Sequence, residues 1–136
     1  MSFGTALHVM MALAYNDGRH LTSQDLANSV GVNAVTVRKL IGQLTEAGLV
    51  ETQPGPGGGA RLARSPQRIS VDDVFAAVDR PAFVKAHGKE VFDVCPVSTC
   101  MPNVFERLNS AIAQKAAPVL NKTTLKMLVD EEIPSS

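Results

Sequence analysis

The sequence predicts a fold that is mainly α, with a small β-wing: a winged helix-turn-helix followed by a long carboxy-terminal helix. Three patterns lead to this fold class. Two short amphipathic segments flank Gly31, a turn rich in glycine and proline at 54–59 separates two strand-like segments, and apolar residues recur with a helical period after Pro102. An apolar fraction of 45% in 136 residues is ample for a core.

The chain begins with a predicted amphipathic helix. Its apolar stripe consists of Phe3, Leu7, Met10, Met11 and Ala14. No signal peptide precedes this helix, and no apolar run reaches the length of about 18 residues that a membrane span needs. We therefore expect a cytoplasmic protein that does not engage a membrane.

The next helix is predicted to begin beside Thr22 or Ser23, either of which can accept a hydrogen bond from a free backbone N–H. Its apolar face consists of Leu26, Ala27 and Val30. Gly31 supplies the backbone freedom that a tight turn between two helices requires.

The helix after this turn has two distinct faces. Asn33 is its expected N-cap and Gly48 its expected C-cap, while the apolar residues Val37, Leu40, Ile41 and Leu44 recur at the spacing of one inward face. The outward arc contains Val35, Lys39, Gly42 and Glu46, with Thr36, Arg38 and Gln43 on its flanks.

A hairpin, the predicted wing, follows this helix. Strand-like residues 49–53 and 61–63 flank the turn 54–59, in which glycine lets a backbone approach a phosphate closely. Arg61 and Arg64 stand just behind the turn, within reach of a sugar-phosphate backbone or a minor groove.

The outward arc and the wing together predict binding to double-stranded DNA. Asn33, Thr36 and Arg38 can donate to base edges or phosphates, Lys39 can neutralise a phosphate, and Val35 can contact a thymine methyl group. An alternative is that this helix-turn-helix docks a protein and that its basic residues are only solvated. The full set of candidate DNA contacts is Ser23, Asn33, Val35, Thr36, Arg38, Lys39, Gly57, Gly58 and Arg61.

Basic and acidic residues are distributed only slightly unevenly along the chain. The net charge is zero, but residues 1–70 carry six basic and four acidic side chains, a net charge of +2, and the remainder carries −2. This asymmetry favours sequence-selective binding with a modest salt dependence over strong non-specific binding.

The second half of the chain predicts three helices and a loop. Residues 69–78 form a short helix capped by Ser70, with Val71, Val74, Phe75 and Val78 buried. Residues 80–99 form a loop, with a short strand or turn near 83–86. A long helix starts at Pro102 and ends or kinks at Pro118, and Thr123 or Thr124 caps a last helix over 125–129.

The long helix is the predicted dimer interface, through Phe105, Leu108 and Ile112. A homodimer would present two reading helices to a near-palindromic site with half-sites about one DNA turn apart. The alternative is that this stripe packs within the monomer.

The segments GVNAVTVRKLIGQLTEAGLVET, GPGGGARLARSP and ISVDDVFAAV, in this order, resemble the Rrf2 family of bacterial winged-helix repressors. The resemblance extends over nearly the whole chain. It implies a homodimeric transcription regulator in which residues 1–66 bind DNA, and residues 67–136 provide a sensor loop and dimerisation helices. By motif match, the DNA contacts fall on Asn33, Val35, Thr36, Arg38, Lys39, Gly57, Gly58 and Arg61. Where many members have an arginine at the start of the wing, this chain has Gln53 and Pro54.

Cys95 and Cys100, the only two cysteines, lie where the resembled family keeps its sensor loop. Iron-sulfur members use three clustered cysteines there, so a cluster in this chain would need two other ligands, such as Glu106, His87 or His8. A zinc site has the same shortage of ligands, and we predict neither metal nor cofactor.

A thiol switch is chemically simpler. The loop through Pro96 could bring the two Cα atoms to about 5.5 Å, and Cys100 lies near the predicted helix start, where free N–H groups favour a thiolate. Two inert, reduced cysteines are an equal alternative.

No enzymatic function is predicted. The glycines of 55–59 lie in a hairpin and not between a strand and a helix, and the three histidines, His8, His20 and His87, are scattered along the chain.

Overall fold

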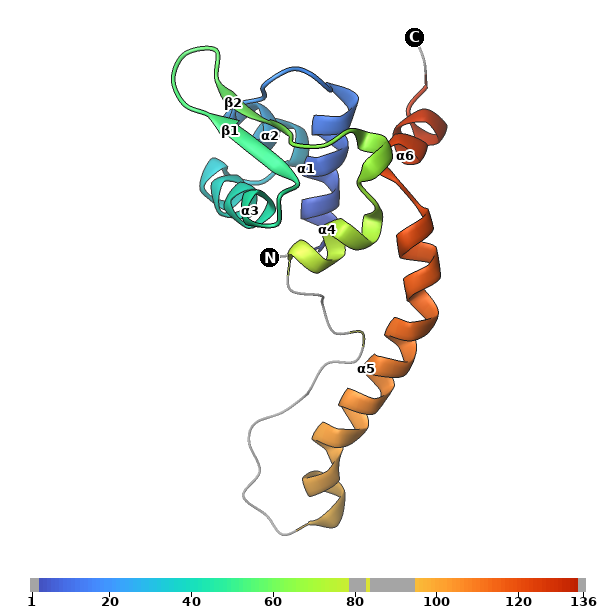
Figure 1. Cartoon of the computed structure of the whole chain (residues 1–136). Coiled ribbons are helices and arrows are strands. Elements are labelled where there is room, and N and C mark those ends of the chain that lie inside the picture. Colours follow the sequence, from blue (N-terminus) through green and yellow to red (C-terminus); the bar gives the residue numbers. More distant parts are fainter. Residues whose placement is uncertain (1–2, 79–82, 84–94, 135–136) are drawn as a thin grey trace. The chain divides into compact units, whose positions relative to one another are not determined.

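The computed structural model describes residues 3–78, 83 and 95–134 (Figure 1). The chain divides into two units, Met1–Pro81 with Leu120–Ser136, and Ala82–Val119. The helices of the first unit are α1 (Phe3–Tyr15), α2 (Ser23–Val30), α3 (Ala34–Glu46), the 3-10 helix η1 (Pro66–Arg68), α4 (Val71–Ala77) and α6 (Leu125–Glu132). Its strands are β1 (Val50–Gln53) and β2 (Gly59–Leu62). α5 (Pro96–Lys122) belongs to the second unit as far as Val119. The predicted fold class, mainly helical with a small two-stranded wing, is confirmed.

α1 contacts α2, α4, α6 and β2, so it is covered on more than one side. Its buried residues are Ala6, Val9, Met10, Leu13 and Ala14, whereas Leu7 and Met11 of the predicted stripe are only half-buried. The predicted stripe included Met10 and Ala14 but missed Ala6, Val9 and Leu13, which are buried because several elements cover α1. Phe3 packs edge-on against Phe75 of α4, with ring centroids 5.0 Å apart.

α2 and the turn after it follow their predicted end signals. Thr22 is the N-cap: its side chain accepts the Asp25 N–H, and the Asp25 carboxylate accepts the Thr22 N–H, which forms a capping box. These hydrogen bonds from Thr22, the backbone bond first, lower the pKa of Asp25 below its ordinary value. Gly31 ends α2 in a left-handed conformation, with φ of 82°.

α3 is anchored at both ends. The Asn33 side chain accepts the Thr36 N–H at 2.9 Å, as predicted for the N-cap. At the carboxy-terminal end, the N–H of Gly48 donates to the carbonyl of Thr45, and the N–H of Leu49 donates to the carbonyl of Leu44. These two bonds form a Schellman motif, in which Ala47 is the C-cap and the left-handed Gly48 follows it.

The two strands of the wing are antiparallel, with Val50 paired to Leu62 and Gln53 paired to Gly59. β2 begins at Gly59, two residues earlier than predicted. The cause is a further pairing, because Leu21 and Ala60 exchange backbone hydrogen bonds of 2.9 and 2.8 Å. A Cβ on Gly59 would lie 2.4 Å from the Leu21 carbonyl oxygen, so only glycine permits this approach.

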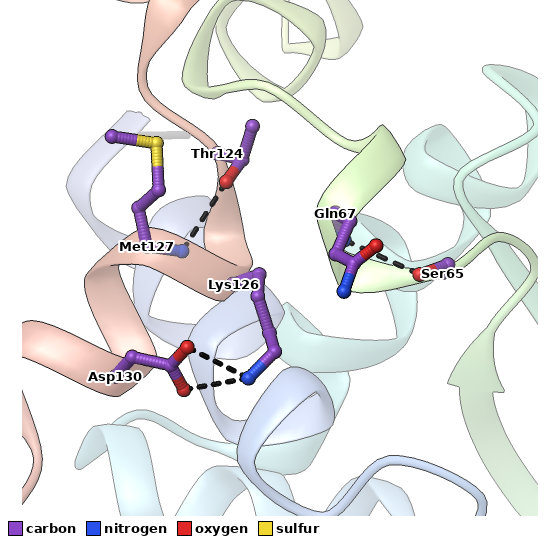
Figure 2. A network of polar contacts seen from close by, with 6 residues as sticks. All are labelled: Ser65, Gln67, Thr124, Lys126, Met127 and Asp130. Carbon is purple, nitrogen blue, oxygen red and sulfur yellow. Dashed lines mark hydrogen bonds and ion pairs between the residues drawn. The ribbon is translucent and has the colours of Figure 1, made fainter.

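α4 and α6 are joined at their amino-terminal ends. Ser70 and Asp73 form a capping box on α4, and Thr124 caps α6 by accepting the Met127 N–H, as Figure 2 shows. The Val71 N–H donates to the Thr123 carbonyl at 2.8 Å, and the Leu125 N–H donates to the Ile69 carbonyl at 3.0 Å. α6 therefore continues the core of the first unit.

α5 differs from the prediction at both ends. It begins at Pro96 and not at Pro102, and it continues through Pro118 to Lys122. Pro96 occupies the first helical position, which suits proline as well as Pro102 would. Each internal proline leaves one carbonyl without its helical partner, but no residue of α5 is buried, so water can bond to these carbonyls. None of the described helices has the length and apolar character to cross a bilayer.

The two faces of α3 give a direct test of the packing. We expect Leu40→Ala, which truncates a side chain with no exposed surface, to lower the free energy of unfolding by about 2–5 kcal/mol. The matched control is Val35→Ala on the same helix, at a position 56% exposed, which should change it by less than about 0.5 kcal/mol. Urea denaturation measures both, and equal losses would contradict the assignment of the inward face.

Candidate nucleic-acid interface

The outward face of α3 is open in the first unit. Arg38 and Lys39 are exposed, and Val35 is exposed over 56% of its surface, whereas Val37, Leu40, Ile41 and Leu44 on the other face are all buried. An isolated valine at such a position has no packing role, but it can contact an apolar group of a ligand. The face therefore combines two cations with one apolar contact.

Two polar residues complete the amino-terminal end of this face. Asn33 is exposed, and since its Oδ1 atom accepts the Thr36 N–H, its Nδ2 amide hydrogens remain available to an incoming acceptor. Thr36 is half-buried. Ser23 is the half-buried first residue of α2, next to the N-cap Thr22. Asn33, Thr36 and Ser23 thus lie at the amino-terminal ends of α3 and α2.

The two predicted wing glycines have different surroundings. Gly57 is exposed, with φ of 77° and nothing within 4 Å of the position of an added Cβ. Gly58 is buried: a Cβ there would lie 2.1 Å from the Gln53 carbonyl oxygen, and its N–H donates to the Gly55 carbonyl at 3.0 Å. Gly58 therefore closes the turn, and we do not retain it as a surface contact.

The wing arginines are exposed but paired. Arg61 Nε donates to Glu51 Oε1 at 2.5 Å across the hairpin, in the register that places these residues opposite each other. Arg64 Nε lies 3.5 Å from the Gly48 carbonyl oxygen, and its Nη1 lies 3.9 Å from Asp73 Oδ2. Exposed pairs of this kind are worth only about 0–1 kcal/mol, so a phosphate can compete for Arg61.

Glu51 was missed in the sequence analysis. Its effect on Arg61 depends on the cross-strand register, and the early start of β2 sets that register. Counting the strand residues outward from the glycine turn would have placed Glu51 opposite Arg61.

The two cysteines lie at the start of α5 and not in a loop. Cys95 precedes the helix, and hydrogen bonds from the first turn lower the pKa of its thiol. The N–H of Ser98 has the largest effect, and the N–H of Val97 and the side chain of Ser98 add smaller ones. Cys100 is inside the helix, where its thiol donates to the Val97 carbonyl at 3.2 Å. The helix start that favours a thiolate therefore belongs to Cys95, contrary to the prediction for Cys100.

Helical geometry keeps the two thiols apart. Five residues of α-helix separate two positions by about 7.5 Å along the axis and by about 140° around it. Disulfide-bonded residues need Cα atoms within about 7 Å. Both cysteines are free. The predicted bend that would bring them to bonding distance is absent in this part of the described chain, so a disulfide would require the first turn of α5 to unwind.

The donor set for a metal or an iron-sulfur cluster is incomplete within the described residues. No three His, Cys, Asp or Glu side chains gather there in a way that could hold a metal ion. His8 lies 3.3 Å from the Ser29 hydroxyl, Glu106 is an exposed residue of α5, and His87 is outside the described residues. Two diverging thiols do not fit one metal centre on their own.

The predicted dimer residues form an exposed apolar stripe on α5. Leu108 and Ile112 are 45% and 38% exposed, and Phe105 is half-buried. Val104 extends the stripe by one position. None of the 27 residues of α5 is fully buried, so this helix leaves apolar surface exposed.

Comparisons with known proteins agree with this fold. Residues 2–131 match the Rrf2 family, described as an iron-dependent transcriptional regulator. The chain is 33% identical over 70 residues to the putative HTH-type transcriptional regulator BadM of Rhodopseudomonas palustris, covering 52% of this chain and 45% of that protein. It is 31% identical over 111 residues to the HTH-type transcriptional regulator IscR of Vibrio atlanticus, covering 80% of this chain and 61% of that protein.

The similarity to solved structures concerns the fold. CymR of B. subtilis, titled a global cysteine regulator, superimposes with a TM-score of 0.66 at 23% identity, over 96% of this chain and 95% of that one. The matched regions span only about half of the curated relatives named above.

The position of Cys95 leads to a test of its thiol. In the Cys100→Ser variant, we expect the rate of alkylation by iodoacetamide to reach half its maximum at a lower pH in the folded protein than in the same protein unfolded in urea. The N–H groups of Ser98 and Val97 stabilise the thiolate only when α5 is formed. Equal midpoints in the two states would show that the helix start has no effect on this thiol.

Proposed function

Because the chain belongs to the Rrf2 family of transcriptional regulators, we propose that it regulates transcription by binding double-stranded DNA through α3 and the wing. The observation that carries the proposal is the exposed edge of α3. Val35, Arg38 and Lys39 lie opposite an aliphatic stripe whose burial leaves them no role in the core of the first unit. The named relatives are regulators of transcription, in agreement with the prediction that the chain is not an enzyme.

The residues divide into base-reading and phosphate-binding groups. In a major groove, Asn33, Thr36 and Arg38 would contact base edges or nearby phosphates, and Val35 would contact a thymine methyl group. Lys39 would neutralise phosphate, and Ser23 at the start of α2 would donate to the backbone of the same strand. The wing would add Gly57 by close backbone approach and Arg61 by exchanging Glu51 for a phosphate.

We also propose that two copies bind as a homodimer to a near-palindromic operator. The stripe of Phe105, Leu108 and Ile112 is an apolar face that a second α5 could cover. Two reading helices related by a two-fold axis would then meet half-sites about one helical turn of DNA apart. A dimer bound in this way covers its operator, which favours a role as a repressor.

A redox response is a second proposal, favoured by the lowered pKa of Cys95. The Cys95 thiolate attacks a peroxide such as hydrogen peroxide, which oxidises the sulfur to a sulfenic acid and releases hydroxide. The Cys100 thiol then displaces that oxygen as water and forms a disulfide. Since the helix separates the two sulfurs, this second step unwinds the first turn of α5. This thiol chemistry needs no cluster, although the family is described as iron-dependent.

The charged pair on α3 gives the test of DNA recognition. We expect Arg38→Ala to weaken binding to a selected operator by about 1–3 kcal/mol and to relax the preference at one base pair. Lys39→Ala should weaken binding to all duplexes alike and reduce the dependence of affinity on salt concentration. Fluorescence anisotropy with operator and scrambled duplexes at two salt concentrations separates these effects.

The control is Glu46→Gln at the far end of the outward arc, which should leave affinity and selectivity nearly unchanged. If neither Arg38→Ala nor Lys39→Ala affects binding, α3 is not the reading helix. A wild-type protein that selects no duplex and shows no salt dependence would support the alternative of a winged helix that docks protein.

The dimer is tested by a charge on the α5 stripe. We expect Leu108→Asp to shift the protein from dimer to monomer in sedimentation equilibrium, because a carboxylate would be buried in an apolar interface. The matched control is Gln114→Asp on the opposite side of α5, which should leave the dimer intact. Dissociation by both variants, or by neither, would reject this stripe as the interface.

A further inference from the structure

A small polar cavity lies in the first unit, formed by residues that have no part in the proposed DNA contacts. It has a volume of about 270 Å³. Its apolar walls are Ala14 of α1, Pro66 of η1 and Val129 of α6. The polar side chains that line it are Asp17, Ser65, Gln67 and Lys126. Since pockets for drug-sized molecules begin near 300 Å³, this cavity fits only a small ligand.

The cation of the cavity is Lys126, which forms an ion pair with Asp130 that is weak enough for a ligand to compete with. Lys126 Nζ donates to both carboxylate oxygens of Asp130, at 2.8 and 2.7 Å, as Figure 2 shows. The two side chains are 44% and 53% exposed, so water screens their attraction. An ammonium has three N–H donors, and a carboxylate in the cavity can therefore bond to Lys126.

Two neutral polar groups of the cavity are Gln67 of η1 and Ser65, the N-cap of η1 (Figure 2). Ser65 Oγ accepts the Gln67 N–H at 3.3 Å, and its own O–H can still donate. The Gln67 side-chain amide supplies both a donor and an acceptor. These neutral groups can orient a ligand whose charges are bound elsewhere.

The anion of the cavity is Asp17, on the turn after α1. Its N–H bonds to the Ala14 carbonyl at 3.2 Å, which holds the backbone of this turn, and its carboxylate forms no ion pair within the described residues. The cavity thus presents one carboxylate and one ammonium. A simple anion would be repelled by Asp17, and a divalent cation would be repelled by Lys126.

We propose that this cavity binds a free α-amino acid. The ligand carboxylate bonds to Lys126 and to the amide of Gln67, and the ligand ammonium bonds to Asp17. Ser65 donates to the same carboxylate, and the short side chain of the ligand packs on Ala14, Pro66 and Val129. A zwitterion offers a carboxylate to Lys126, in competition with Asp130, and an ammonium to Asp17, which neither an amine nor a carboxylic acid alone can do.

The position of the cavity connects the ligand to the wing. η1 follows β2 after three residues, and the backbone bonds between Val71 and Thr123 and between Ile69 and Leu125 join the next segment to the start of α6. A ligand that binds both η1 and α6 would fix the position of η1, and so the direction of the chain that leaves the wing at the end of β2. This regulatory role, unlike the binding itself, rests on the proposed function in DNA binding.

Binding is measured on the free protein without DNA. Each of the common L-amino acids is added alone at millimolar concentration, and the melting temperature of the full chain is recorded. We expect at least one to raise the melting temperature, because a ligand of the native state stabilises it. For that amino acid, calorimetric titration should show that its N-acetyl derivative and its methyl ester bind about tenfold or more weakly, since each lacks one charge.

Two variants break the same ion pair with opposite consequences for the ligand. Lys126→Met removes the cation of the cavity and should weaken binding about tenfold or more, as should Asp17→Asn. Asp130→Asn also breaks the pair, but it releases Lys126, so binding should be equal or tighter. Circular dichroism verifies that the three variants are folded.

The proposal is overturned if no amino acid changes the melting temperature, if Lys126→Met and Asp17→Asn bind as the wild type does, or if the derivatives bind equally well. Failure of the DNA-binding proposal is seen separately, as loss of duplex binding by a protein that still binds the amino acid. A protein that binds duplex DNA but no amino acid would refute this site alone.

Discussion

The burial of one side of α3 is the constraint on which the rest of the structure depends. Val37, Leu40 and Leu44 have no exposed surface and Ile41 has little, and burying each such side chain contributes about 1.5–3 kcal/mol. Since successive helical residues are about 100° apart, this burial sets the outward direction of Val35, Arg38 and Lys39. The Asn33 cap and the Schellman motif at Gly48 fix where the helix begins and ends, and so which of its residues stand at the exposed amino-terminal end.

The wing is held to this core by buried side chains and by backbone contacts. Val50 of β1 and Ala60 and Leu62 of β2 are buried in the core. Gly59 lies so close to the Leu21 carbonyl that no Cβ fits, and Gly58 is packed in the same way against the Gln53 carbonyl. β2 therefore shares hydrogen bonds, through Ala60, with Leu21, the residue that precedes the Thr22 cap of α2. The tip, which includes the exposed Gly57, has no such contact and is open to a ligand. Fixed strands and an open tip are what a wing requires to approach a phosphate backbone.

Local signals in the sequence were sufficient for the N-caps of α3 and α4 and for the inward faces of these two helices. Asn33 and Ser70 are the N-caps, and the buried residues of α3 and α4 are those that the apolar spacing predicts, because capping and periodicity depend on neighbours in the chain. Most of the errors concern contacts between one element and another, which the pattern within a single helix or strand does not encode. The role of Gly58, the pairing of Arg61 with Glu51 and the partial exposure of Leu7 and Met11 depend on the strand register and on which elements cover α1. The start of α5 was wrong because Pro96 and Pro102 carry the same local signal.

The central claim is that the amino-terminal half of the outward face of α3, with the wing tip, meets DNA. The most direct measurement is the change in backbone amide chemical shifts when isotope-labelled protein is titrated with random duplex DNA at low salt, since non-specific binding uses the same phosphate contacts. The account predicts that the largest changes fall on Val35, Thr36, Arg38 and Lys39 and on residues 55–61. Changes concentrated on other surfaces of the first unit, or no changes at all, would contradict it.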